Sequence, residues 1–265
     1  MGLSGRSAVA AVIPATPKIR SASLDGPWAW VAAGWADFRR AGLYSLAYGV
    51  AFVAVIYLTT AGFWLAGLSA WIPVGVGGLA LIGPLLATGL YDISRRLESG
   101  APLSWGVVAR TRVPAPGQLA MLGFALCLIF MVWLRAAQLI FAVFVQGDYP
   151  PLADFTTYIL STRDGLELLT VGTAVGACLA FAAFVVSAIS APMLLDRDID
   201  VMTAIITSIN VLKRQPGLML LWAWIVAVLV VVGAATAFLG LIIAFPVLGH
   251  TAWHAYRSLV EPAAR

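Results

Sequence analysis

Charged residues are scarce in this 265-residue chain: they make up 11% of it, and most of its 16 Lys and Arg lie in short clusters between long apolar runs. Hydrophobic residues account for 62%, and the mean hydropathy is +0.96. A soluble domain of this composition would lack the polar residues needed to cover its surface. The sequence therefore predicts an integral membrane protein.

Cysteine and histidine are equally rare, with two of each. Cys127 and Cys178 both lie inside apolar runs, so the chain has no disulfide framework and no set of thiolate metal ligands. We expect both to be small packing residues. Two histidines are too few for haem–copper chemistry, and the sequence has no nucleophile elbow, phosphate loop or zinc-binding helix motif. We therefore predict that the protein is not an enzyme and needs no cofactor.

Long apolar runs lie at 44–65, 72–91, 119–145, 168–194 and 218–256. A helix needs about 20 predominantly apolar residues to cross a bilayer, so each of the first four can supply one span. The last is too long for one helix, and we predict two helices that meet near 233–240. The expected fold is all-α, a transmembrane bundle of six spans in three hairpins within residues 28–260. Residues 1–27, rich in Ala, Ser and Pro, are expected to form a disordered cytoplasmic tail.

The basic residues are distributed asymmetrically about these spans. Fourteen of them fall in the N-terminal segment before the first span, in the connections near 92–118 and 195–217, and at the C-terminus. The segment 146–167 between the third and fourth spans holds Arg163 alone against four acidic residues. Because cytoplasmic connections are enriched in Lys and Arg, both termini are predicted to be cytoplasmic.

Two cytoplasmic segments are predicted to be helices lying at the membrane surface. Val201, Ile205, Ile209 and Leu212 recur every three or four residues, and Asp200 stands at the N-cap position. The second segment combines aromatic and basic residues, which favour the headgroup region: Trp28, Trp30, Trp35, Phe38, Arg39 and Arg40.

Several motifs in the chain resemble those of a known family. The sequence Gly-Pro-Leu-Leu-Ala-Thr-Gly-Leu-Tyr at 83–91, followed by Ser-Arg-Arg-Leu-Glu at 94–98, is similar to signatures of the bacterial membrane protein family called domain of unknown function 2189. Segments 190–196, 249–257 and 34–37 resemble it as well. The resemblance implies a multi-pass protein of a bacterial inner membrane. It implies no catalytic activity, because the family has no assigned activity.

Arg135 is the clearest candidate for an intramembrane polar site, because it lies within the third span. A charge in the hydrocarbon costs roughly 2.5–3.5 kcal/mol on insertion scales and normally faces a partner or a wet cavity. Glu167 at the outer mouth of the fourth span is the nearest predicted partner. Gln138 lies on the same helix as Arg135, further out. The group is predicted to be either an anion or headgroup site, or a structural pair with Arg135 extending towards the outer interface.

Polar residues also gather at the predicted cytoplasmic boundary. His250 and His254 are four residues apart and share a helix face, which is a spacing that can bind a metal. A third ligand would have to come from Asp92 or from the acidic cluster around Asp196. We favour interfacial hydrogen bonding over a metal site, and we count Arg95, on the same boundary, among these polar candidates.

Three classes of function remain after these exclusions. A non-catalytic scaffold, assembly factor or lipid-organising protein is favoured, because none of the twelve Asp and Glu lies clearly inside a span. A permease or channel for a small solute is the alternative, and an enzyme ranks last. The expected partners are the lipid bilayer and either other membrane proteins or further copies of the chain; no nucleic acid is expected. Gly172, Gly176 and Ala180 predict close approach of a neighbouring helix, within the bundle or between copies.

Overall fold

The computed structural model describes residues 17–111, 113–145 and 152–262. Within these residues the secondary structure is helical apart from one isolated antiparallel bridge, between Ile19 and Val260. The predicted all-α class is therefore confirmed. The elements are α1 (Gly26–Ala41), α2 (Leu43–Leu65), η1 (Ser69–Trp71), α3 (Ile72–Leu81), α4 (Gly83–Leu86), α5 (Thr88–Ser99), α6 (Trp105–Val108), α7 (Pro116–Phe144), α8 (Leu152–Ser161), α9 (Arg163–Ser187), α10 (Ser190–Asp196), α11 (Val201–Arg214), α12 (Pro216–Ala235) and α13 (Leu241–Leu259).

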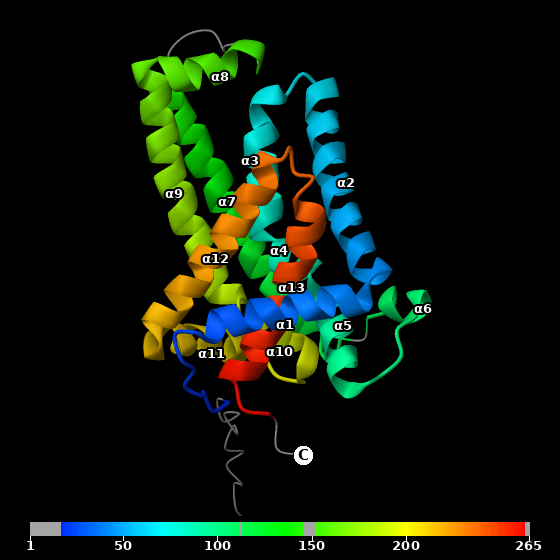
Figure 1. Cartoon of the computed structure of the whole chain (residues 1–265). Helices are drawn as coiled ribbons and strands as arrows, with labels where there is room; N and C mark the ends of the chain where they lie inside the picture. The colour runs from blue at the N-terminus through cyan, green and yellow to red at the C-terminus, as the bar shows by residue number, and fades with distance from the viewer. Residues whose placement is uncertain (1–16, 112, 146–151, 263–265) are drawn as a thin grey trace, which may run out of the picture.

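The long helices stand upright, and shorter helices collect at their lower end (Figure 1). We call this lower end the base; it consists of α1, α5, α10, α11 and the C-terminal half of α13. Helices α1 and α11 lie across it, whereas α8 crosses the opposite end of the molecule (Figure 1). Neighbours along the chain pack against each other in the pairs α2 with α3, α7 with α9, and α12 with α13.

Among the residues that the structure describes, four helices are long and apolar enough to cross a membrane: Leu43–Leu65, Pro116–Phe144, the combined α9 and α10 at Arg163–Asp196, and Pro216–Ala235. The predicted span at 72–91 is instead broken into α3, α4 and α5. Pro84 explains the break between α3 and α4, because its ring removes a backbone donor and clashes with the preceding helical turn. The predicted turn near 233–240 is present, since α12 ends at Ala235 and α13 begins at Leu241. Six spans remain a prediction.

Burial is concentrated in the base. Leu90, Met193, Leu194 and Tyr256 are fully or almost fully inaccessible to solvent. The upright helices, in contrast, expose many large apolar side chains, among them Leu58, Phe124 and Trp224. A protein of this size in water would not leave such an apolar surface open, whereas a bilayer covers it.

Helix α1 lies directly against α13. Its buried face consists of residues at helical spacing: Pro27, Trp30, Gly34, Asp37 and Ala41. Gly34 allows the close approach: a Cβ added there would lie 2.3 Å from Oγ1 and 2.8 Å from the backbone nitrogen of Thr251. The aromatic residues predicted to lie at the headgroups therefore differ in their exposure. Trp28 and Trp35 are exposed, but Trp30 is buried.

The described part of the predicted tail is attached to the base. Arg20 N donates to the Leu259 carbonyl at 2.9 Å, and Glu261 N donates to the Lys18 carbonyl at 3.0 Å. The Gln215 side chain accepts a hydrogen bond from Ala22 N at 2.8 Å. For residues 17–25 the expectation of disorder is therefore wrong, because paired backbone groups hold the segment in place. The rest of the predicted tail, 1–16, lies outside the described residues.

Candidate functional site: a polar cluster in the base

His250 is completely buried and bridges three helices. Its Nε2 lies 2.7 Å from Ser45 Oγ on α2, and its Nδ1 lies 2.8 Å from Ser94 Oγ on α5. A neutral imidazole has one donor and one acceptor nitrogen, so one serine hydroxyl donates to the ring and the other accepts from it. No local sequence pattern indicated this arrangement, since Ser45 and Ser94 are far from His250 along the chain.

His254, one turn further along α13, faces a different partner. Its Nε2 lies 2.8 Å from Oδ2 of Asp37 on α1. Burial by itself would raise the pKa of the Asp37 carboxyl, but hydrogen bonds from His254 and Ser94 and the nearby histidines outweigh it and hold that pKa below its ordinary value of 3.8. Asp37 thus stays ionised in the base and ties α1 to α13.

Asp92 is a buried carboxylate with two cationic neighbours on its own helix. Arg95 and Arg96 both bond to it, the latter from Nε at 2.9 Å, and Asp92 is 1% exposed. Arg95 also donates from Nη1 to the Leu195 carbonyl at 2.9 Å, which connects α5 to α10. A buried charge is tolerated when it is paired and hydrogen-bonded in this way. Asp92 and Arg95, both singled out from the sequence, therefore belong to one group.

Asp196 accepts a hydrogen bond from the Tyr256 hydroxyl at 2.7 Å, and that hydroxyl in turn accepts from Arg197 Nε at 2.7 Å. Glu98 on α5 accepts hydrogen bonds from two residues of α13, from Trp253 Nε1 at 3.0 Å and from Arg257 Nη2 at 2.8 Å. These bonds join α5, α10 and α13. Sequence reasoning missed Glu98, although a carboxylate close to a helix end rich in arginine was a usable signal.

The cluster as a whole satisfies its own polar groups. Among the described residues no group of three or more His, Cys, Asp and Glu side chains is arranged to hold a metal ion. His250 and His254 point to different partners, so they do not converge with Asp92 or Asp196 on one ligand.

The contact between Ser45 and His250 has the form of a nucleophile and its base. Both residues are completely buried, so in this conformation a substrate has no access to them.

Of the three intramembrane candidates, Arg135 and Gln138 are brought together, but Glu167 is not. Arg135 is exposed on α7 and donates to Gln138 Oε1 at 3.0 Å. Glu167, its predicted partner, instead accepts from Arg163 Nε at 3.0 Å. The predicted pairing of Arg135 with Glu167 is therefore wrong, because Arg163 stands one helical turn from Glu167 on the same helix.

Two packing predictions can be compared with the structure. Cys127 and Cys178 are both exposed on the surfaces of their helices, so they do not pack inside the bundle. Gly176 lies against the Trp133 ring, with 3.3 Å between the ring and a Cβ added at Gly176, whereas a Cβ at Gly172 meets nothing within 4 Å. Only Gly176 of these two glycines provides a close approach within the bundle.

The structure has notable cavities at both ends. One, of about 290 Å³, lies at the base between residues 17–19, α11 and Glu261. The other, of about 570 Å³, lies at the opposite end, where α7 ends and α8 meets α9, and it is lined in part by Arg163 and Glu167. Neither of these two cavities is lined by Arg135.

The upright helices are apolar, and the polar groups of the base are hydrogen-bonded to one another. These features define an all-helical integral membrane protein. Residues 71–196 match the model of the family described as "Predicted integral membrane protein (DUF2189)", and this segment belongs to that family. The resemblance inferred from the motifs at 83–98 and 190–196 is thereby confirmed. The match includes Asp92, Arg95 and Asp196 but not the two histidines. No curated protein and no solved structure matches the chain.

Proposed function

We propose that this protein is a non-catalytic component of a bacterial inner membrane that organises lipids or assembles other membrane proteins. The observation that carries the proposal is the polar cluster of the base. Its buried charges and hydroxyls are bound to one another across α1, α2, α5, α10 and α13. Such a network rigidifies a platform and leaves few groups for turnover of a substrate.

The same proposal includes a finer topology, in which α3 to α5 and α13 also cross the bilayer, giving six spans in three hairpins with both termini in the cytoplasm. The distribution of cations supports it. Arg39, Arg95, Arg197 and Lys213 all belong to the base or its connections, whereas Arg163 begins α9 at the far end, next to α8. Basic residues mark the cytoplasmic side of membrane proteins. Reporter fusions test this: a reporter after Arg265 should report the cytoplasm and one at 146–151 the periplasm.

Extraction of the protein in native lipid discs, followed by mass spectrometry, tests the organising role. We expect a defined lipid or membrane protein to travel with the chain in constant ratio. Recovery of the chain alone, with bulk lipid in bulk proportions, would contradict the proposal.

The alternative, a permease or channel, depends on Arg135. Replacement of Arg135 with Leu should leave folding intact, since its side chain is exposed and bonds to Gln138 alone among the contacts of the described residues. Under the organising role the variant alters at most stability or association. Loss of flux of a solute in a folded R135L variant would favour the permease and overturn the proposal.

A further inference from the structure

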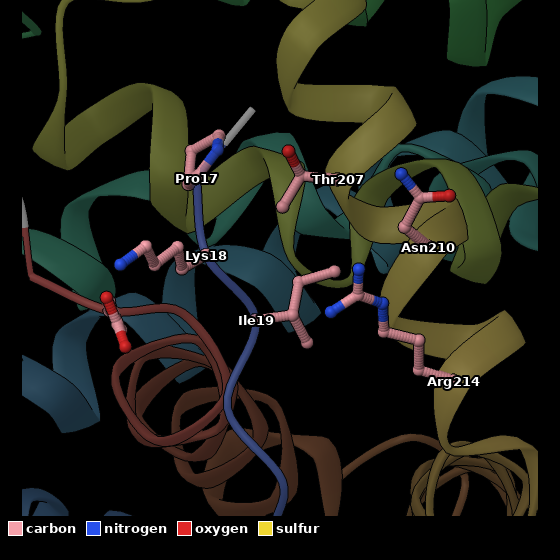
Figure 2. Close-up of a pocket in the computed structure, with 7 residues that line it drawn as sticks. Pro17, Lys18, Ile19, Thr207, Asn210 and Arg214 are labelled. Atoms are coloured by element: carbon pink, nitrogen blue, oxygen red, sulfur yellow. The ribbon is translucent and has the colours of Figure 1, made fainter. Parts of the chain in front are cut away.

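The cavity at the base has a charged lining that the polar cluster does not use. Thr207, Asn210 and Arg214 reach it from α11, Lys18 and its neighbours from the N-terminal segment, and Glu261 from the C-terminal segment (Figure 2). Its volume of about 290 Å³ is close to the lower limit of small-molecule sites, which run from roughly 300 to 1,000 Å³. A compact group, rather than an extended ligand, fits this space.

The three charged side chains of the lining are not neutralised by ion pairs. None of the ion pairs in the described part of the chain involves Lys18, Arg214 or Glu261. The lining therefore carries a formal charge of +1, from two cations and one carboxylate. The Glu261 backbone nitrogen donates to the Lys18 carbonyl at 3.0 Å, which holds the two residues side by side in the lining. Arg214 extends from α11 on the other side of the 17–19 segment, near Asn210 (Figure 2).

This charge pattern selects the ligand. Arginine presents several donors in a planar fork suited to phosphate oxygens, and the Asn210 amide adds further donors. A net charge of +1 matches a monoanion, while Glu261 repels a second negative charge. A phosphate diester carries one negative charge, whereas a free phosphate or phosphate monoester carries between one and two near neutral pH.

The position of the cavity relates it to the membrane. Arg214 is the last residue of α11, and α12, one of the four candidate spans, begins two residues later at Pro216. The Arg214 side of the cavity therefore lies at the end of an apolar helix, at the level where lipid headgroups are found. We propose that this cavity binds the monoanionic phosphate diester of a glycerophospholipid headgroup, with Arg214 and Asn210 as donors and Glu261 as the residue that disfavours dianions. The inference goes beyond the proposed organising role and does not depend on the number of spans.

The test uses the purified full-length chain, stripped of lipid in a neutral detergent. Retention of phosphatidylglycerol is measured by native mass spectrometry, and soluble glycerophosphoglycerol and inorganic phosphate are titrated as competitors. We expect Arg214→Ala to weaken lipid retention about tenfold, the size of one lost charge-assisted hydrogen bond. Lys213→Ala is the matched control, because it removes the same charge from the same helix outside the cavity. The Lys213→Ala variant should retain phosphatidylglycerol about as well as the wild type.

Two further variants sharpen the test. Asn210→Ala should weaken retention less than Arg214→Ala, and Glu261→Gln should abolish the preference for the diester over inorganic phosphate. If glycerophosphoglycerol displaces phosphatidylglycerol, the headgroup suffices for binding. If phosphatidylglycerol is retained and glycerophosphoglycerol does not displace it, the acyl chains are needed as well. Both outcomes support the site. Equal losses in the Arg214 and Lys213 variants, or no retention by the folded wild type, would overturn it. These binding results are separate from the reporter and co-purification results that test the proposed function.

Discussion

Gly34 and Thr251 bring α1 and α13 together so closely that a Cβ added at Gly34 would lie 2.8 Å from the Thr251 backbone nitrogen and 3.0 Å from its Cα. Contacts with backbone atoms are not relieved by a change of side-chain rotamer. Gly34→Ala should therefore push the two helices apart and lower the free energy of unfolding by about 1–3 kcal/mol. Unfolding in mixed micelles followed by circular dichroism measures this loss.

Gly172→Ala serves as the control for that experiment, because Gly172 is also helical and an added Cβ meets nothing within 4 Å. Alanine is the better helix former, so this variant should be unchanged or slightly more stable. Equal stability of the two variants would show that α1 does not dock on α13 as described.

Replacement of His250 with Ala should be among the most damaging single changes in the base. It opens a cavity and removes the partner of both Ser45 and Ser94, which are buried. We expect a loss of about 2–4 kcal/mol in the free energy of unfolding. The double variant S45A, H250L removes the histidine together with the Ser45 hydroxyl and leaves Ser94 its hydrogen bond to Asp37, so it should be more stable than H250A. A double variant less stable than H250A would show that Ser45 does not hold the histidine.

The carboxyl of Asp37 predicts a specific dependence of stability on pH. Its pKa in the folded protein lies below the ordinary value of 3.8, so its ionised form stabilises the fold. That contribution is fully present above the unfolded-state pKa and is lost as the pH falls through the lower folded-state pKa. The melting temperature of the wild type should therefore exceed that of Asp37→Asn at neutral pH, and the difference should shrink below about pH 4.

Asp25 provides the comparison for the pH experiment, because it precedes the same helix but its side chain makes no capping hydrogen bond. Asp25→Asn should leave the pH profile of the melting temperature near that of the wild type. A gap between wild type and Asp37→Asn that is constant from about pH 7 to 3 would contradict the assignment.

Asp200 caps α11 through hydrogen bonds from Thr203, with 2.8 Å between Thr203 N and Asp200 Oδ1. Asp200→Ala should cost about 1 kcal/mol, typical of a lost N-cap. Asp200→Asn keeps an acceptor at the same position and should recover most of the loss. Chemical denaturation of the three proteins in one detergent measures both effects, and equal stabilities would mean that the cap is not formed.

The sequence predicted elements whose cause is local. The apolar runs predicted α2, α7, the combined α9 and α10, and α12 to within about five residues, because hydrocarbon length and backbone hydrogen bonding favour a helix over any other structure for a long apolar segment. Asp200 was assigned as a cap for the same kind of reason: the N-cap interaction reaches only three residues along the chain.

The candidate site could be predicted only in part. The structure brings His250, His254, Asp92, Arg95 and Asp196 together in the base, while their place at the cytoplasmic boundary of the bilayer stays a prediction. Their partners could not be assigned. Ser45 lies 205 residues from His250 along the chain and Asp37 lies 217 from His254, and no local pattern connects them.

Composition and periodicity alone thus determined that this chain is a membrane protein, that it is helical, and where its long apolar helices lie. Tertiary structure alone decided which charges meet. Arg135 is exposed and bonds to Gln138 instead of Glu167. Asp37 reaches His254 because the close contact between Gly34 and Thr251 packs α1 against α13. Helix formation depends on neighbours within four residues, whereas the pairing of buried charges depends on which helix faces come into contact, and that is set by packing between segments distant in the sequence.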